Sequence, residues 1–251
     1  MIKALRKTIT VALFLLPVIF ISCFFLYPIA AILWNGLQSQ DHLNQLTEVL
    51  RAPRSQKAIW FTFWQATIST VITILVALPS AALISKMKKR SRKWVRAAIT
   101  VPFVLPTIVV AGAFEAVFKQ LGIDRGPLSL HHTSWAIILA HVFFNYAVVA
   151  RTVGSFWSGL DYRVEEQARL LGANKWQAFW QVTFPALKPA IYASAVITYL
   201  FSFTSFGIIL VLGGPRKATL ETEIYRYAIT RSDFQSASSL ALLQLIAVLL
   251  L

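Results

Sequence analysis

The sequence contains little charge, few acidic residues and almost no cysteine. Charged residues make up 14% of the 251 positions, and 10 Asp and Glu stand against 24 Lys and Arg. Because an ordinary soluble domain carries about 25% charged residues, this balance excludes a typical soluble enzyme or binding module. The single cysteine, Cys23, excludes a disulfide framework. Apolar side chains dominate instead: 57% of residues are hydrophobic and the mean hydropathy is +0.64, as in membrane proteins.

Motifs for catalysis are also missing. No Gly-x-x-x-x-Gly-Lys-Ser/Thr phosphate loop occurs, so we expect the chain neither to bind nor to hydrolyse ATP. No nucleophile–base group stands out, and His131 and His132 lack nearby carboxylate or cysteine ligands. We therefore expect no catalytic residue, no metal and no cofactor. The net charge of +14 clusters beside apolar segments, where it sets topology and favours lipid headgroups rather than nucleic acid.

Six apolar segments divide the chain, most of them near the ~20 residues that cross a bilayer as a helix. Backbone amides inside a bilayer must be bonded within the protein, and uninterrupted apolar runs lack the alternation of a barrel. We therefore predict an all-α membrane protein with about six transmembrane helices. The segments are Val11–Trp34, Ile59–Ile84, Ala97–Phe118, Ser134–Val153, Pro189–Leu212 and Ala237–Leu251.

The last of these segments is short. Its fifteen residues would rise about 22 Å as a helix, against a hydrocarbon core of ~30 Å. We therefore expect residues 1–251 to form one transmembrane domain whose final helix is truncated or continues in a longer polypeptide.

Basic residues predict the orientation. If the N-terminus is cytoplasmic, segments 1–10, 85–96 and 151–188 lie inside and hold fifteen Lys and Arg, against nine outside. Short loops rich in Lys and Arg stay inside, so we expect a multi-pass protein of the bacterial cytoplasmic membrane with a cytoplasmic N-terminus. The first apolar run is too long for the ~7–15-residue core of a signal peptide. A retained first helix is favoured, and a cleaved signal is the alternative.

The polar loop of residues 161–188, called the hairpin below, predicts two short helices. Asp161 is placed to cap the first helix, and Gly172 stands where a helix stop needs a left-handed residue. Glu165 is expected on the exposed side of this helix. Its apolar face carries Val164, Ala168 and Leu171.

The second helix of the hairpin begins at a capping box, in which Asn174 and Gln177 satisfy each other's backbone amides. We expect Pro185 and Pro189 to end this helix and lead into the fifth span. From the residues alone, an amphipathic hairpin resting on lipid is a sufficient explanation. One side of the helix carries Trp176, Phe179, Trp180 and Thr183.

The hairpin also resembles the EAA loop of type I ABC-importer permeases. That pattern is Glu-Ala-Ala, three residues, Gly, nine residues, Ile, one residue and Leu-Pro. Gln167, Val182 and Phe184 depart from it, and Gln167 alone changes polarity. The resemblance implies a coupling helix that docks on a separate ATPase, with Glu166 meeting a basic residue and Gly172 making the turn. The coupling residues that it implies are Glu165, Glu166, Gln167, Ala168, Gly172, Trp176 and Pro185.

Other stretches are similar to the thiamine-importer permeases, with ferric-iron importer permeases as close relatives. They include Phe61–Ala66, Ala140–Asn145, Leu212–Pro215 and Thr219–Tyr225. In both groups one polypeptide often contains two permease halves, and this chain resembles the first half. The resemblance implies translocation of a small solute by alternating access, with thiamine favoured and ferric iron second.

A few polar and aromatic side chains interrupt the predicted helices and are candidates for the substrate pathway. Carboxylates in a membrane are costly unless paired or wetted, and polar residues on one helix face can instead join helices by hydrogen bonds. Both explanations stay open for this set. Its members are Glu115, His141, Asn145, Ser202 and Phe206.

The leading hypothesis is therefore a permease subunit or half of an ATP-driven importer. Its expected partners are ATPase subunits, a second permease half, an extracytoplasmic substrate-binding protein and membrane lipid. An ion-coupled secondary transporter is the first alternative, although Glu115 alone gives little support for an ion site. A structural membrane anchor for a soluble enzyme is the second alternative.

Overall fold

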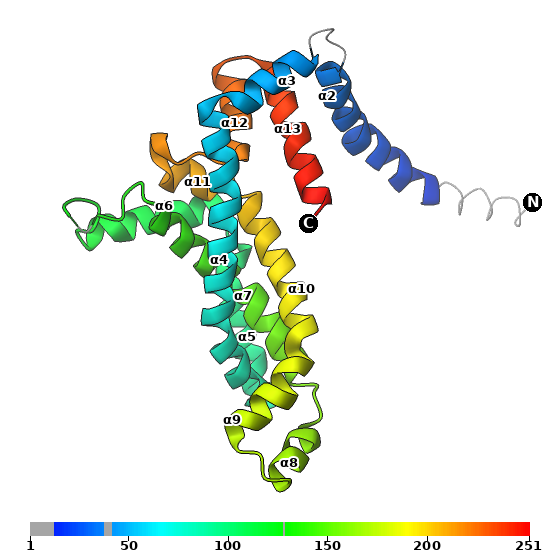
Figure 1. Ribbon diagram of the computed structural model, residues 1–251, viewed down its shortest axis with the longest axis vertical. Helices are drawn as coiled ribbons and strands as arrows, with labels where there is room; N and C mark the ends of the chain where they lie inside the picture. Colours follow the sequence, from blue (N-terminus) through cyan, green and yellow to red (C-terminus); the bar gives the residue numbers. More distant parts are fainter. Residues whose placement is uncertain (1–12, 38–41, 128) are drawn as a thin grey trace, which may run out of the picture. The chain divides into compact units, whose positions relative to one another are not determined.

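The computed structural model describes residues 13–37, 42–127 and 129–251, and every regular element in these ranges is a helix (Figure 1). This confirms the all-α prediction. The chain divides into two compact units, which are described separately. One unit is Met1–Ser55 together with Glu223–Leu249, and the other is Gln56–Thr222 together with Leu250–Leu251.

Within the described ranges, four helices are long and apolar enough to cross a membrane, rather than the six that the sequence predicts. The basic residues and the start of the first expected span, before residue 13, lie outside the described ranges. The sixth expected span is a shorter apolar helix, α13 (Phe234–Leu249). The four long helices are Leu13–Ala31, α4 (Pro53–Lys86), α7 (Ser134–Trp157) and Lys175–Phe203.

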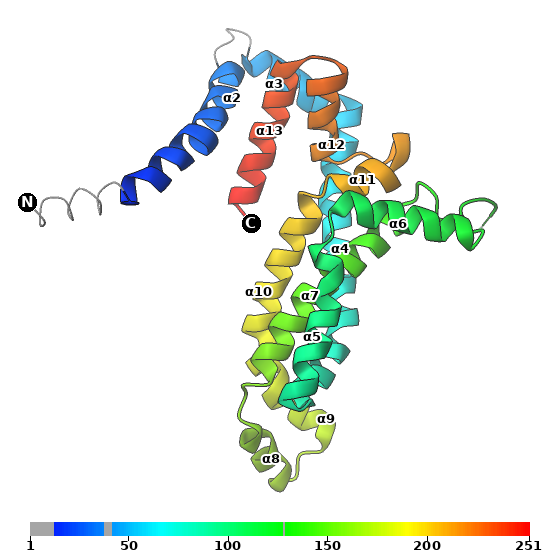
Figure 2. The same ribbon diagram turned by 180° about the vertical axis from the view of Figure 1, so that it is seen from behind.

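The third expected span is not one helix, which corrects the prediction for Ala97–Phe118. It consists of α5 (Lys89–Val104) and α6 (Thr107–Gln120), which meet at 93° (Figure 2). Pro106 disfavours helical backbone at the residue before it, and Leu105 is extended with ψ 144°. The amides of Val109 and Val110 then bond to the Pro106 carbonyl and begin α6. Counting this pair as one broken span gives five.

The fifth expected span, Pro189–Leu212, also ends differently. Helix α10 (Phe184–Phe203) stops at Thr204, and a separate helix α11 (Gly207–Leu212) packs against α6. A side chain on Gly207 would lie 2.6 Å from Thr107 Oγ1 and 2.9 Å from the Ile108 amide nitrogen. Glycine therefore permits the close approach of α11 to the start of α6.

The core of the second unit joins α4, α7 and α10. Small side chains are frequent in this core. Small residues let membrane helices approach closely, because lipid supplies no hydrophobic driving force between helices. Gly154 of α7 illustrates this, because a Cβ there would stand 3.2 Å from the Ile84 Cγ2. The buried cluster is Ala77, Ala81, Ile84, Val149, Ala150, Val153, Trp157, Leu187 and Ala190.

In the first unit, α13 packs against α2 (Tyr27–Leu37) and α3 (His42–Arg51). The unit also contains the π-helical turns η1 (Ser22–Leu26) and η4 (Arg226–Thr230) and part of α12 (Leu220–Tyr225). A short 3-10 turn, η3 (Gly214–Arg216), precedes α12 in the chain and belongs to the second unit.

A buried carboxylate holds the first unit together. Glu223 forms ion pairs with Arg54, at 2.8 Å, and with Arg226. Burial alone would raise the pKa of Glu223, but hydrogen bonds and charges from the two arginines outweigh it and hold the pKa below 4.5. Glu223 also raises the pKa of Arg226 by accepting its hydrogen bonds. No local sequence pattern points to this cluster, because Arg54 and Glu223 lie 169 residues apart in the chain.

We predict that Glu223→Gln destabilises the protein by about 3 kcal/mol, because it leaves Arg226 partly buried without its charge partner. In the native protein the lowered pKa of Glu223 contributes stability that is complete above about 4.5 and is lost as the pH falls below that value. Thermal unfolding in detergent from pH 7 to pH 3 measures both effects. Asp124→Asn, which removes the pair of half-buried Asp124 with exposed Arg125, is the control and should change little. Equal unfolding temperatures for all three proteins would contradict the prediction.

Candidate functional site

The hairpin lies at one end of the second unit, where α7 and α10 meet it (Figure 1). Its first helix is α8 (Tyr162–Leu170), and the Asp161 carboxylate accepts the Arg163 amide at 3.0 Å. The predicted N-cap is therefore confirmed. The helix stop at Gly172 is also confirmed, since its φ is +99°, in the region that favours glycine.

The stop is a Schellman motif. The Gly172 amide donates to the Arg169 carbonyl, and the Ala173 amide donates to the Ala168 carbonyl, both at 3.1 Å. These two bonds satisfy carbonyls that the end of α8 would otherwise leave unpaired. The turn is therefore defined by the backbone and does not depend on packing elsewhere.

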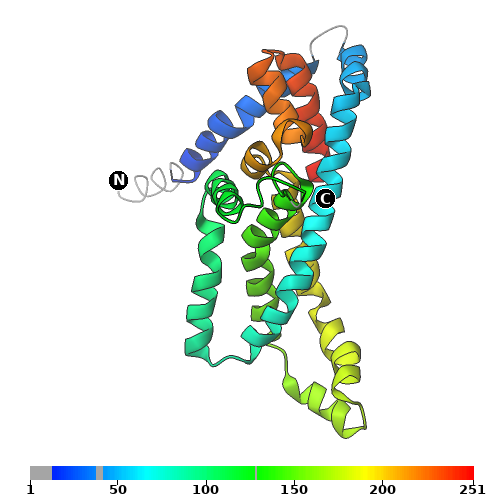
Figure 3. The same cartoon turned by 90° about the vertical axis from the view of Figure 1, so that its left-hand side faces the viewer.

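The second helix begins with the predicted capping box. The Asn174 amide donates to Gln177 Oε1 at 2.9 Å, and the Gln177 amide donates to Asn174 Oδ1 at 2.8 Å. The helix comprises α9 (Lys175–Ala178) and the π-turn η2 (Phe179–Thr183), and it continues directly into α10 (Figure 3).

The expectation that prolines end this helix is therefore wrong. Pro185 falls in the first turn of α10, where the missing amide proton is tolerated. The π-turn before it moves the bonding pattern, because the Phe184 amide donates to the Phe179 carbonyl five residues back. Pro189 lies inside α10 without breaking it. The result is one helix of 29 residues from Lys175 to Phe203.

Glu165 does not lie on the exposed side of α8, which corrects the position that helical periodicity predicts for it. Its Oε2 accepts a hydrogen bond of 2.7 Å from Thr183 Oγ1, and Thr183 is buried. The contact fastens α8 to the π-turn of the other arm. A cleft of about 220 Å³ lies beside it, lined by Trp157, Leu160, Asp161, Tyr162, Val164, Glu165, Val182, Thr183 and Ala186.

Aromatic rings pack against one another along the second arm. Trp180 lies between Trp176, at 5.5 Å between ring centroids, and Phe184, at 4.6 Å. Trp157 of α7 stacks on Phe179 at 5.9 Å and ties the arm to the transmembrane core. Offset and edge-to-face pairs of this kind add to the stability gained from burial.

The tip of the hairpin nevertheless exposes apolar side chains. Leu170 and Leu171 are 87% and 90% exposed, and Trp176 is 69% exposed. Glu166 is exposed beside them, and Ala168 is half-buried. Among the described residues Glu166 forms no ion pair. Contiguous exposed apolar side chains mark a surface that meets a partner or a membrane.

Three pathway candidates meet inside the second unit. Asn145 Nδ2 donates to Ser202 Oγ at 3.2 Å, and His141 Nδ1 lies 3.3 Å from Ser69 Oγ. Gln65 Nε2 donates to the Ser202 carbonyl at 2.7 Å. All five residues are buried, so the cluster joins α4, α7 and α10 by hydrogen bonds. The sequence did not identify Gln65 and Ser69 as members of this cluster, although their spacing of four residues places them on one face of α4.

The other two candidates are not buried like the members of this cluster. Glu115 is exposed on α6, and Phe206 is half-buried at the start of α11. The polar cluster itself retains buried atoms without a partner among the described residues: Gln65 Oε1, His141 Nε2 and Asn145 Oδ1. Buried polar groups of this kind are where ordered water binds, or where a helix arrangement changes.

Comparison with protein families gives one match, over residues 73–251, to the family described as binding-protein-dependent transport system inner membrane component. The molybdenum transport system permease protein ModB of Mycobacterium tuberculosis is 30% identical over 213 residues, covering 81% of this chain and 80% of the relative. The thiamine transport system permease protein ThiP of Haemophilus influenzae is 29% identical over 227 residues, covering 87% of this chain but 40% of the relative. The sulfate transport system permease protein CysT of Escherichia coli is 26% identical and covers 93% and 86%.

Solved structures show the same fold. The chain is similar to a bacterial ABC transporter involved in the import of the acidic polysaccharide alginate, with a TM-score of 0.76 and 19% identity over 98% of this chain and 92% of the other. It is also similar to an inward-facing MetNI methionine ABC transporter, with a TM-score of 0.60 and 18% identity over 78% and 90%.

We predict that Thr183→Val frees the arms of the hairpin without unfolding the transmembrane helices. The change removes a hydrogen bond to a carboxylate, worth about 1.5 kcal/mol, which corresponds to roughly tenfold more frequent opening. Hydrogen–deuterium exchange of the α8 amides measures this directly. Ser158→Ala, whose hydroxyl bonds only to the Ser155 carbonyl of its own turn, is the control and should leave α8 exchange unchanged. Unaltered α8 exchange in Thr183→Val would show that the Glu165 contact does not hold the arms together.

Proposed function

This chain belongs to the family of inner membrane components of binding-protein-dependent transport systems, and we propose that it is a permease half that ATPase subunits drive through the hairpin. The family and fold establish an ABC-importer permease component of the membrane rather than an enzyme. The proposed part is the route by which the energy of ATP hydrolysis enters the permease. In this proposal a separate pair of ATPases docks on residues 161–188, and their closure moves the helices around a central path.

The observation that carries the proposal is the unbroken helix from Lys175 to Phe203. Its 29 residues span about 43 Å at 1.5 Å per residue, from the exposed hairpin through the transmembrane core. A force applied at Trp176 therefore reaches α10 without passing through a flexible joint. The stacking of Phe179 on Trp157 carries the same displacement to α7.

The chemistry of the hairpin tip suits a protein groove. Leu170, Leu171 and Trp176 offer apolar area, and Glu166 offers an unpaired charge to a basic residue of the ATPase. Gly172 sets the turn that aims both arms, while Ala168 leaves room between them. Gln167 replaces the first alanine of the family pattern and is exposed, where its amide would contact the partner rather than the interior.

We propose the orientation in which the hairpin and the basic end of α5 are cytoplasmic. Fifteen of 24 Lys and Arg then lie inside, in agreement with the distribution typical of membrane proteins. An extracytoplasmic binding protein would deliver the cargo to the opposite side. The second permease half is either fused to this chain, as its coverage of 40% of the thiamine relative suits, or separate.

For the cargo we propose a small solute, with thiamine first and ferric iron second on the resemblance of short stretches such as Ala140–Asn145 and Thr219–Tyr225. Relatives named for molybdenum and sulfate transport have similar identity, so the overall likeness does not separate these cargoes. The pathway residues proposed are His141, Asn145 and Ser202, together with Glu115 and Phe206. The buried cluster that contains His141, Asn145 and Ser202 would respond when α4, α7 and α10 shift during alternating access.

We predict that Glu166→Ala and Gly172→Val each reduce ATP-dependent uptake about tenfold, the effect of losing one important contact of a protein interface. Glu166→Ala removes the charge, and Gly172→Val forces a side chain into a φ of +99° and redirects the tip. Uptake into cells, with membrane levels measured by immunoblot, tests both.

The matched controls carry the same chemical changes elsewhere. Gly126→Val places the same side chain at a φ of +88° in the loop between α6 and α7, and Glu48→Ala removes an exposed charge from α3. Both should transport normally. Transport at the native level by Glu166→Ala and Gly172→Val would exclude energy transfer at this hairpin.

The cargo is tested by growth. Cells that lack the chain should fail on limiting thiamine but grow on limiting iron, molybdate or sulfate, and competition of labelled uptake by each unlabelled solute should follow the same order. Failure on iron alone would replace thiamine by the second choice. Failure on an oxyanion alone would reject both.

A further inference from the structure

The second unit also contains a basic cleft that takes no part in the proposed coupling. A cleft of about 850 Å³ runs along α5 and reaches α7, and five basic side chains and no acidic one line it. The basic residues are Lys89, Arg92, Lys93, Arg96 and Arg151. Arg96 lies close enough to both Arg92 and Arg151 to be repelled by them. Like charges gathered without counter-charges call for an anion.

The guanidinium groups are held in place with donors to spare. Arg92 Nη2 donates to the Ser85 and Met87 carbonyls at 3.2 and 2.8 Å, while Arg92 Nε has no partner among the described residues. Arg151 Nη1 donates to Thr100 Oγ1 at 3.3 Å. Arg96 Nε and Nη2 are buried and also unpartnered within the described part of the chain. Hydrogen bonds thus hold Arg92 and Arg151, and guanidinium groups gathered in this way match the oxygens of a phosphate.

The other end of the cleft is apolar. Beyond Thr100 it is lined by Val101, Val104 and Leu105, and Val104 is 77% exposed. From Lys89 to Val104 the helix rises about 22 Å, which exceeds the ~15 Å thickness of one leaflet's hydrocarbon. The cleft therefore changes from cationic to apolar along its length, as a phospholipid changes from headgroup to acyl chain. A small free oxyanion would use only the basic end.

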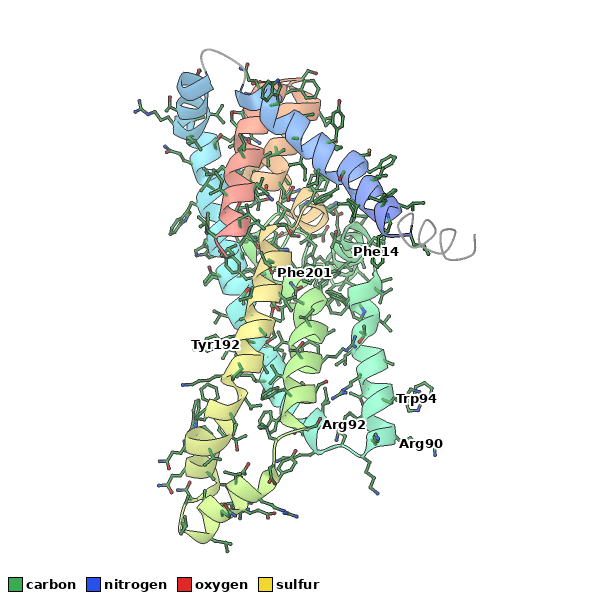
Figure 4. All side chains as sticks on the ribbon, turned by 90° about the vertical axis from the view of Figure 1, so that its right-hand side faces the viewer. Phe14, Arg90, Arg92, Trp94, Tyr192 and Phe201 are labelled. Atoms are coloured by element: carbon green, nitrogen blue, oxygen red, sulfur yellow. The ribbon has the colours of Figure 1, made fainter. Side chains whose placement is uncertain are left out.

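The neighbouring residues agree with a position at the membrane surface. Trp94, 71% exposed, points away from the cleft on α5, whereas Arg92 lies on the side of the neighbouring helices (Figure 4). Exposed Trp side chains concentrate at the headgroup level of a bilayer. Basic pockets between transmembrane helices are also suited to anionic headgroups.

We propose that this cleft binds an anionic phospholipid, with its phosphate at Arg92, Arg96 and Arg151 and an acyl chain along Val101, Val104 and Leu105. The site needs neither an ATPase nor cargo. It is therefore independent of the proposed function, and either proposal can fail without the other.

The test uses the full chain, purified in a neutral detergent. Phosphatidylglycerol or phosphatidylcholine is titrated against it, and bound lipid is counted by native mass spectrometry. We expect phosphatidylglycerol to bind at least about tenfold more tightly than phosphatidylcholine. This measurement needs no variant. Equal binding of the two lipids would overturn the proposal.

Two triple variants then locate the site. Arg92→Gln, Arg96→Gln and Arg151→Gln together remove three charges from the cleft, and Lys86→Gln, Lys88→Gln and Arg90→Gln remove three exposed charges at the same end of the unit but outside the cleft. The cleft variant should lose at least about tenfold more phosphatidylglycerol affinity than the control. Equal losses would show a diffuse surface attraction and overturn the site.

Inorganic phosphate and sulfate distinguish the two sources of the same anionic group. Each is added at millimolar concentration to the complex with phosphatidylglycerol. We expect neither to displace the lipid, because neither reaches the apolar end of the cleft. Displacement by either salt, with the ionic strength matched by sodium chloride, would replace the lipid site by a small-oxyanion site and overturn the proposal.

Discussion

The structure depends on one mechanical constraint, the continuity of the helix from Lys175 to Phe203. A hairpin that ended at Pro185 would rest on the membrane as a separate body. Because the π-turn brings Pro185 into the first turn of α10, the exposed Trp176 and the buried serine at position 202 belong to one continuous helix. In the proposed function, this continuity is what links docking at the tip to hydrogen bonding in the core.

Local signals in the hairpin were predictable from sequence, whereas contacts between its arms were not. Asp161, Gly172 and Asn174 act through contacts that span two to five residues, and their chemistry fixes the outcome wherever the hairpin sits. The position of Glu165 depends on Thr183, eighteen residues away, and helical periodicity alone placed it on the wrong side. The effect of Pro185 depends on a π-turn that no residue type signals.

The membrane segments likewise have features that the sequence predicts and features that depend on distant contacts. Apolar composition correctly predicted helices, because a bilayer leaves the backbone few alternatives. It could not show that Leu105 and Pro106 turn the chain by 93° or that Thr204 separates α10 from α11, since apolar residues flank each break on both sides. The break before Gly207 is stabilised by its close packing on Thr107, a contact between segments a hundred residues apart. The ion pairs of Glu223 with Arg54 and Arg226 also depend on a distant partner.

Acidic residues are scarce in this chain, so an exposed carboxylate that forms no internal ion pair is informative. With 10 carboxylates among 24 cations, most acidic groups could find a partner within the chain, and Glu223 and Glu165 do bond internally. Glu166 has Arg163 and Arg169 three residues away on the same helix, yet among the described residues it pairs with neither. In a chain this basic, an unpaired carboxylate beside exposed leucines suits an ion pair with a basic residue of another protein. The basic cleft along α5 has the complementary character, since five basic and no acidic side chains line it and its walls continue into apolar surface. The two surfaces therefore suit different partners, and the two proposals assign a protein to the hairpin and a lipid to the cleft.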